Sequence, residues 1–209
     1  MAIHVHLPGR HGSGAPFLRT GKDAGAWGGD RAPLTDWPEM SGNRPGPRGD
    51  QKTMRVGQGW DVHRIAEGRA LILGGVTVPS AFGLDGHSDA DVLSHAITDA
   101  ILGAVALGDI GMHFPDTDAR WKDADSLIFL RHVCGLAAAA GYRIVNVDST
   151  VILERPKLKE FRLAIRESLA HAMGLKVDQI SVKFKTAERV GPVGEGKSAE
   201  SQAVVLMEG

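Results

Sequence analysis

Residues 88–106 read SDADVLSHAITDAILGAVA, and this stretch predicts a long helix that packs in the protein interior. Its apolar residues return at helical spacing, as Val92, Ala96 and Ala100 show. Ser88 is a good N-cap, and Asp91 three residues later is an Asp variant of the capping box. We therefore expect the helix to begin at Ser88 and to anchor the fold around it.

The segments on either side of this helix alternate between strand and helix patterns. Upstream, residues 55–63 predict a strand, and 70–78 predict a second strand with a turn or bulge at its Gly pair. The elements expected downstream are a helix capped by Asp125 or Ser126 and stopped by Gly141, a strand over 142–153, a helix that Pro156 opens and that ends near Gly174, and closing strands over 180–187 and 203–207. This order predicts an α+β fold, with a single mixed β-sheet and helices packed on one face.

Composition separates residues 1–53 from the rest of the chain. They hold 10 of the 27 Gly and 6 of the 10 Pro, and they show no sustained period of strand or helix. We therefore predict a disordered and dispensable leader over 1–53 and one domain over 54–209. His4 and His6 form a His-x-His pair, which we interpret as part of this tail rather than as a metal site.

The charge balance and the apolar runs exclude several classes of protein. Lys plus Arg is 24 and Asp plus Glu is 25, which argues against a nucleic-acid partner. The longest uncharged run, 70–84, is 15 residues and falls short of the roughly 20 apolar residues that a membrane helix needs. Cys134 is the single cysteine, so we interpret it as a small apolar residue on a helix and predict a cytoplasmic protein.

Two histidines and an aspartate form a candidate metal site. Asp61 and His63 lie two apart on a predicted strand and so point to the same face. His95 belongs to a polar row with Asp91 and Asp99, and leaving such groups buried without partners would cost roughly 2–7 kcal/mol each. Asp61, His63 and His95 together suit Zn²⁺, with a fourth position open for substrate. The alternative is that these three residues only hydrogen-bond one another in the core, and their spacing leaves both interpretations open.

The start of the predicted helix is also a candidate phosphate site. Residues 86–89, Gly-His-Ser-Asp, precede it, and free N–H groups with the positive end of the helix dipole attract anions. The alternative is that Ser88 and Asp91 act only as a cap. The acidic loop at Asp109, the basic turn over 155–159 and the strand end over 185–188 are weaker candidates for ligand contact.

Four motifs, in order along the chain, identify a family. Asp-Val-His at 61–63, HSDADVLSHAITDA at 87–100, LGDIG at 107–111 and FPDTD at 114–118 together resemble the 2-C-methyl-D-erythritol 2,4-cyclodiphosphate synthases of the non-mevalonate isoprenoid pathway. The similarity runs from Met54 to about Met207. It implies that 4-diphosphocytidyl-2-C-methyl-D-erythritol 2-phosphate is converted to the cyclic diphosphate and CMP. It also implies a homotrimer with each site between two subunits.

The resemblance assigns roles to individual residues. It implies Zn²⁺ on Asp61, His63 and His95, transition-state stabilisation by His87 and Thr186, and a second divalent ion, Mg²⁺ or Mn²⁺, on Glu188. The substrate-binding positions that it implies are Asp61, His63, His87, Ser88, Asp109, Ile110, Gly111, Phe114, Pro115, Asp116, Thr117, Asp118, Leu153, Glu154, Arg155, Pro156, Lys157, Leu158, Lys159, Lys185, Thr186, Ala187 and Glu188.

One segment departs from the family pattern. Residues 191–198 read GPVGEGKS, where many relatives read GFTGRGEG. In the family that Phe and Arg help to form a central cavity that holds an isoprenoid diphosphate, and Pro192 and Glu195 stand in their places. We expect Glu195 to repel such a ligand. Two other functions stay open at this point: a zinc phosphohydrolase that delivers water to a phosphate, and a metal-stabilised trimeric binding protein without turnover.

Overall fold

The structure is a computed structural model that describes residues 53–209, so His4, His6 and the predicted leader up to residue 52 lie outside it. Its strands are β1 (Met54–Glu67), β2 (Leu71–Leu73), β3 (Val76–Val78), β4 (Phe82–Leu84), β5 (Arg143–Ile152), β6 (Ile180–Lys185) and β7 (Ser198–Glu208). Its α-helices are α1 (Val92–Ala104), α2 (Ile110–His113), α3 (Ser126–Ala139), α4 (Arg162–Met173) and α5 (Gly191–Gly194). Short 3₁₀ turns lie at Ala119–Trp121, Lys159–Phe161 and Val177–Gln179.

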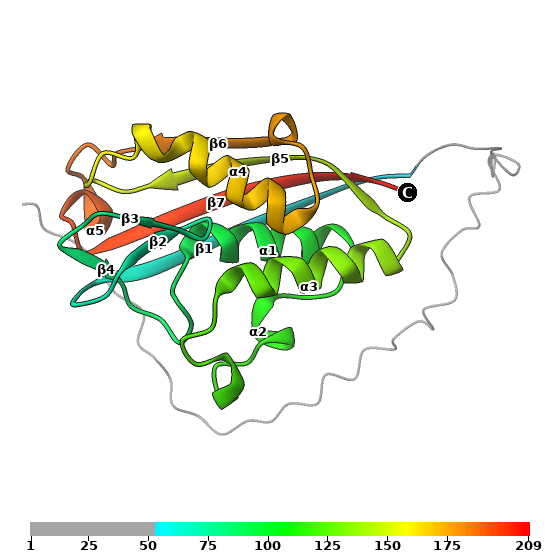
Figure 1. Cartoon of the computed structure of the whole chain (residues 1–209), viewed down its shortest axis with the longest axis horizontal. Coiled ribbons are helices and arrows are strands. Elements are labelled where there is room, and N and C mark those ends of the chain that lie inside the picture. Colours follow the sequence, from blue (N-terminus) through cyan, green and yellow to red (C-terminus); the bar gives the residue numbers. More distant parts are fainter. Residues whose placement is uncertain (1–52) are drawn as a thin grey trace, which may run out of the picture. The chain divides into compact units, whose positions relative to one another are not determined.

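A mixed sheet with the strand order β4-β1-β7-β5-β6 forms the centre of the fold (Figure 1). β5 and β6 are parallel, and the other neighbours in this sheet are antiparallel. The predicted α+β class is therefore confirmed. The prediction of a single sheet is wrong, because β2 and β3 pair with each other as a separate hairpin. Its turn is at Gly74 and Gly75, where the sequence predicted one, and both residues have positive φ.

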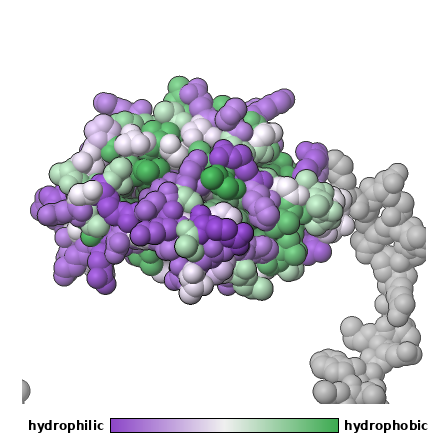
Figure 2. All heavy atoms as spheres, turned by 60° about the horizontal axis from the view of Figure 1, so that its bottom comes forward, coloured by the Kyte–Doolittle hydropathy of each residue, from purple (hydrophilic) through white to green (hydrophobic). Residues whose placement is uncertain are grey.

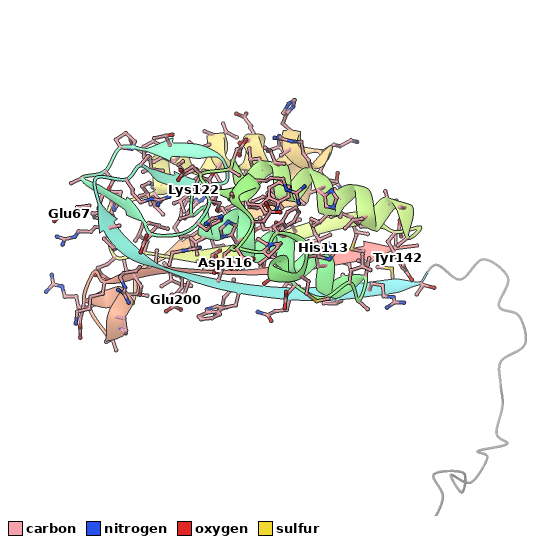
Figure 3. The ribbon with its side chains drawn as sticks, turned by 90° about the horizontal axis from the view of Figure 1, so that it is seen from below. Glu67, His113, Asp116, Lys122, Tyr142 and Glu200 are labelled. Atoms are coloured by element: carbon pink, nitrogen blue, oxygen red, sulfur yellow. The ribbon has the colours of Figure 1, made fainter. Side chains whose placement is uncertain are left out.

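The helices cover one face of the five-stranded sheet. Residues of β5 that alternate toward α1, such as Val147 and Val151, are completely buried. In Figure 3, His113 and Asp116 lie on the helical side of the sheet, and Glu200 lies on the opposite side. That opposite face has no covering element among the described residues, and it exposes a group of apolar side chains: Met54, Val56, Trp60, Val62 and Val204.

Two glycines of β1 let α1 lie directly on the sheet. A Cβ on Gly57 would overlap the backbone of α1 at Ala100, and a Cβ on Gly59 would overlap it at Ala96. Only the absence of a side chain permits this approach. Because His95 neighbours Ala96, the same approach brings His95 to the strand that carries Asp61.

Several predicted element ends need correction. Helix α1 begins at Val92 rather than at Ser88, because the cap is the buried Asp91, whose carboxylate accepts from the backbone N–H groups of Leu93 and Ser94. Pro156 lies in a loop, and α4 starts only at Arg162. Strands β1 and β7 extend beyond the predicted segments, because each pairs with the other along its length.

Other predicted ends are confirmed. Asp125 caps α3 by accepting from Leu127 N, and Gly141 follows that helix with a φ of 85°. Gly174 ends α4 in a left-handed conformation. The short β4 was not predicted, since three residues carry no readable period.

The described residues contain no helix long and apolar enough to cross a membrane. Figure 2 shows a face that is mostly hydrophilic, with hydrophobic side chains in small patches.

Candidate metal centre and ligand cavities

Asp61, His63 and His95 converge in space. Asp61 Oδ2 lies 3.0 Å from His63 Nε2 and 3.0 Å from His95 Nδ1. The two nitrogens lie 3.1 Å from each other. Strand β1 supplies the first two residues on one face, and α1 supplies the third. The tertiary structure thus brings His95 to the pair that strand spacing had placed on one face.

Contacts behind each imidazole fix which nitrogen faces the cluster. His63 Nδ1 lies 2.6 Å from the carbonyl oxygen of Asp85, which only accepts, so this nitrogen carries the hydrogen. In the neutral ring, His63 Nε2 is then left with a lone pair toward the cluster, and it donates a hydrogen bond to Asp61 only when the ring is protonated. On the other side, His95 Nε2 contacts hydroxyl groups, and its Nδ1 faces the cluster.

Electrostatics in the cluster favour a cation. Burial by itself would raise the pKa of Asp61, but hydrogen bonds from His63 and His95 lower it well below its usual range. Burial would lower the pKa of His63, but the hydrogen bond and charge of Asp61 raise it. The cluster therefore stabilises positive charge between its members. Two imidazole nitrogens and one carboxylate oxygen are a donor set that fits Zn²⁺.

The polar row of α1 does not act as a unit. Asp91 turns away to cap the helix, and its other oxygen accepts from Gly75 N at 2.7 Å. Burial raises the pKa of Asp91. Asp99 accepts from Ile110 N at 2.7 Å, and burial, followed by the charges of Asp109 and Asp61, raises its pKa. Of the three, only His95 joins the cluster.

Of the two interpretations of the start of this helix, the structure shows the cap. The Asp91 carboxylate already occupies the N–H groups of Leu93 and Ser94, and Asp91 is completely buried. His87 and Ser88 nevertheless line the cavity beside the cluster, so they can contact a ligand there through their side chains.

A cavity of about 440 Å³ opens beside the cluster, a size typical of small-molecule sites. The predicted residues that line it are Asp61, His63, His87, Ser88, His95, Ile110, Gly111, Phe114, Pro115 and Asp116. Asp109 instead caps α2, and Asp118 caps the turn at Ala119–Trp121; neither they nor Thr117 line the cavity.

Three further residues complete this wall: Asp99, which the sequence placed in the polar row, and two aromatic residues that the sequence interpretation missed. Asp99, Trp121 and Phe129 also line the cavity. Trp121 packs edge-on against Phe129, with ring centroids 5.6 Å apart, and its buried Nε1 has no hydrogen-bond partner among the described residues. No local pattern marks these aromatic residues, because they come from separate segments.

A second cavity, of about 320 Å³, lies where β5 and β6 end. The predicted residues that line it are Leu153, Pro156, Lys157, Leu158, Lys159, Lys185, Thr186 and Glu188. Glu154, Arg155 and Ala187 do not line it, although Glu154 accepts from Ala187 N at 3.2 Å and so ties the two loops together. Arg162 and Phe184, which the sequence interpretation missed, complete the wall, and the guanidinium of Arg162 lies over the Phe184 ring.

Within one chain the two cavities lie at different strands of the sheet. Asp61 is paired with Ser201, Ser201 with Val151, and Val151 with Phe184. Three strand spacings therefore separate Asp61 from Phe184, or roughly 14 Å. A single chain does not bring its candidate metal cluster and its Thr186 segment together.

Outside these sites, Cys134 fits its predicted structural role. It lies half-buried on α3, and burial raises the pKa of its thiol to about 11. A thiol that stays protonated is a poor nucleophile.

The fold and the site define a class: an α+β protein with a candidate metal cluster that opens into a cavity of small-molecule size. Comparison with known proteins narrows this class. The profile of the YgbB family matches residues 54–208. A 2-C-methyl-D-erythritol 2,4-cyclodiphosphate synthase of Solibacter usitatus is 75% identical over 155 residues, which cover 74% of this chain and 98% of the relative.

Solved structures agree with these sequence matches. One described as a 2C-methyl-D-erythritol-2,4-cyclodiphosphate synthase in its CDP-bound form is 43% identical, with a TM-score of 0.68 over 73% of this chain and 99% of the other. The bifunctional IspDF of Campylobacter jejuni is 39% identical, with a TM-score of 0.73 over 76% of this chain and 43% of the other. The chain belongs to the YgbB family, that of the 2-C-methyl-D-erythritol 2,4-cyclodiphosphate synthases.

Proposed function

We propose that this protein converts 4-diphosphocytidyl-2-C-methyl-D-erythritol 2-phosphate to 2-C-methyl-D-erythritol 2,4-cyclodiphosphate and CMP. The observation that carries the proposal is the Asp61, His63 and His95 cluster at the wall of a cavity, in a chain 75% identical to a synthase of that name. An oxygen of the 2-phosphate forms a bond to the β-phosphorus. The bond from that phosphorus to the bridging oxygen breaks, and CMP leaves with the electron pair.

The residues of the larger cavity orient the reacting phosphates. Asp61, His63 and His95 would hold Zn²⁺, which when bound supplies charge neutralisation and Lewis-acid stabilisation. His87 and Ser88 supply hydrogen-bond donors at the same wall. Phosphoryl transfer depends mainly on alignment and charge neutralisation, so no nucleophilic side chain is required.

The second cavity has the properties of a nucleotide site. Its loop and strand ends offer the cations Lys157, Lys159 and Lys185 beside apolar side chains. Glu188 accepts a hydrogen bond from Thr186 and is the proposed ligand of Mg²⁺ or Mn²⁺. One carboxylate together with substrate phosphates is a common way to hold such an ion. The CDP-bound relative supports a cytidyl diphosphate as the ligand.

A homotrimer with sites between subunits would unite the two cavities. Their separation within one chain supports this assembly, and so does the uncovered sheet face with Val56, Trp60 and Val62 exposed. Exposed apolar surface of this kind marks a protein interface. We place the trimer in the cytoplasm, with no nucleic-acid or membrane partner.

The test is to follow the product of the purified full chain by phosphorus NMR, with measured metal content. Formation of a cyclic diphosphate with an equal amount of CMP supports the proposal. Release of inorganic phosphate would instead indicate a zinc phosphohydrolase. Metal binding without turnover of the cytidyl substrate would indicate a binding protein.

A further inference from the structure

Two residues outside the proposed cluster are tied to His95. Ser126, the first residue of α3, is completely buried, and its Oγ lies 2.8 Å from His95 Nε2. The same hydroxyl hydrogen-bonds to Asp89 Oδ1, and Asp89 Oδ2 accepts from Ser126 N at 3.1 Å. A continuous chain of hydrogen bonds thus runs from Asp89 through Ser126 to His95.

Donor and acceptor chemistry fixes the direction of this chain. An ionised carboxylate only accepts, so Ser126 donates its one hydroxyl hydrogen to Asp89. The oxygen of Ser126 must then accept from His95, which places a hydrogen on Nε2. A neutral imidazole carries one N–H, so Nδ1 keeps a lone pair. Nδ1 is the nitrogen that lies 3.0 Å from Asp61 Oδ2.

We propose that Asp89 and Ser126 are positioning residues that hold His95 in its metal-binding tautomer and ring orientation. Partners behind a histidine ligand commonly control metal affinity in this way. The proposal rests on the metal cluster of the proposed function. Ser88 Oγ, 3.1 Å from His95 Nε2, is a longer second contact, and it also lies 3.3 Å from Ser126 Oγ.

The test is the Kd for Zn²⁺ of the full chain, measured by competition with a chelator. Ser126→Ala removes the acceptor for His95 Nε2–H, and Asp89→Asn replaces an acceptor oxygen with a donor. We expect each variant to bind Zn²⁺ about 10- to 100-fold more weakly. Ser149→Ala is the matched control, because Ser149 is equally buried but donates to Ser181 O, away from the cluster. Its affinity should equal that of the wild type.

Asp89 also accepts from Asp91 N, so Asp89→Asn can impair folding. Ser126→Ala removes a single oxygen, so it decides whether this hydroxyl supports Zn²⁺ binding. Ser126→Thr keeps the hydroxyl and is expected to restore tight binding of Zn²⁺. Wild-type affinity for Zn²⁺ in folded Ser126→Ala would overturn the positioning role of Asp89 and Ser126 alone. An equal loss of Zn²⁺ affinity in Ser149→Ala would do the same. If the wild-type chain itself binds no Zn²⁺, the metal assignment of the proposed function is wrong, and the positioning role proposed for Asp89 and Ser126 is wrong with it.

Discussion

His95 is the cluster member that joins the helix to the sheet, so its removal tests the metal assignment directly. We expect His95→Ala to lose bound Zn²⁺ and to lower CMP release by about 100-fold or more, because a metal ion contributes several kcal/mol to charge stabilisation. Metal analysis and a CMP-release assay measure both effects. His171→Ala is the control, since His171 is exposed on α4. Full activity in His95→Ala would show the assignment to be wrong.

The Asp61–His63 pair predicts opposite pH trends with and without metal. The pKa of His63 is raised in the folded chain, despite the opposing effect of burial, by its hydrogen bond to Asp61. The pair therefore stabilises the metal-free protein fully below the unfolded pKa of about 6.5, and this stability is lost as pH rises through the folded pKa. Zn²⁺ affinity should rise over the same interval, because an imidazole must lose its proton to bind metal.

Thermal unfolding in a chelator, and Zn²⁺ titration at several pH values, would measure the two trends. The variant His63→Gln has no proton to exchange at this position and should flatten the stability trend, and its loss of a proposed ligand should weaken Zn²⁺ binding at every pH. A metal affinity that falls as pH rises through this interval would contradict the prediction.

The contact between β1 and α1 makes Gly59, like Gly57, a sensitive position of the strand. A Cβ there would overlap Ala96 O and lie 2.8 Å from Ala100 N, and both atoms belong to the helix backbone. We expect Gly59→Ala to lower the free energy of unfolding by roughly 3 kcal/mol and to weaken metal binding, because α1 must move away. Chemical denaturation measures the loss.

Gly135 on α3 is the matched control for this substitution. A Cβ at Gly135 meets nothing within 4 Å. Gly135→Ala should therefore stabilise the protein by up to about 1 kcal/mol, through helix propensity. Equal stability of the Gly59→Ala and wild-type proteins would show that the close approach of α1 to β1 does not contribute to the free energy of unfolding.

The whole assembly is tested by mixing two inactive chains. If each site takes its metal cluster from one subunit and Thr186 from the next, His95→Ala and Thr186→Ala chains should complement each other. At equal mixing through unfolding and refolding, about a quarter of the sites in a symmetric trimer carry both intact halves. CMP release near that fraction of wild type is expected. A mixture no more active than its components would place the complete site within one chain.

The uncovered sheet face offers an independent test of assembly. Trp60 lies on this face with 48% of its surface exposed, and Trp60→Glu would place a charge in the proposed interface. We expect the sedimentation mass to fall from that of a trimer to that of a monomer, because burying an unpaired charge is costly. Leu163→Glu, at an exposed position on α4, should leave the mass unchanged.

The sequence by itself determined the α+β class, most element cores and the identity of the cluster residues. These follow from local chemistry: the spacing of hydrophobic residues in each segment, helix caps such as Asp125, and the few side chains able to bind Zn²⁺. It offered Asp91 both as part of the helix cap and as a member of the polar row, and it could not decide between these roles, since cap and ligand have the same sequence signature. It also missed Trp121, Phe129 and Arg162, which reach the cavity walls from separate segments.

Only the tertiary structure decided which polar groups meet. Gly57 and Gly59 belong to the strand that the sequence predicts over 55–63, and the structure shows that their role is to admit a helix to van der Waals contact with that strand. That contact brings His95 within 3.0 Å of Asp61, and the start of α3 places Ser126 behind it. Periodicity reports which face of an element is buried, whereas ligand geometry depends on distances between elements far apart in the chain, and packing alone sets those distances.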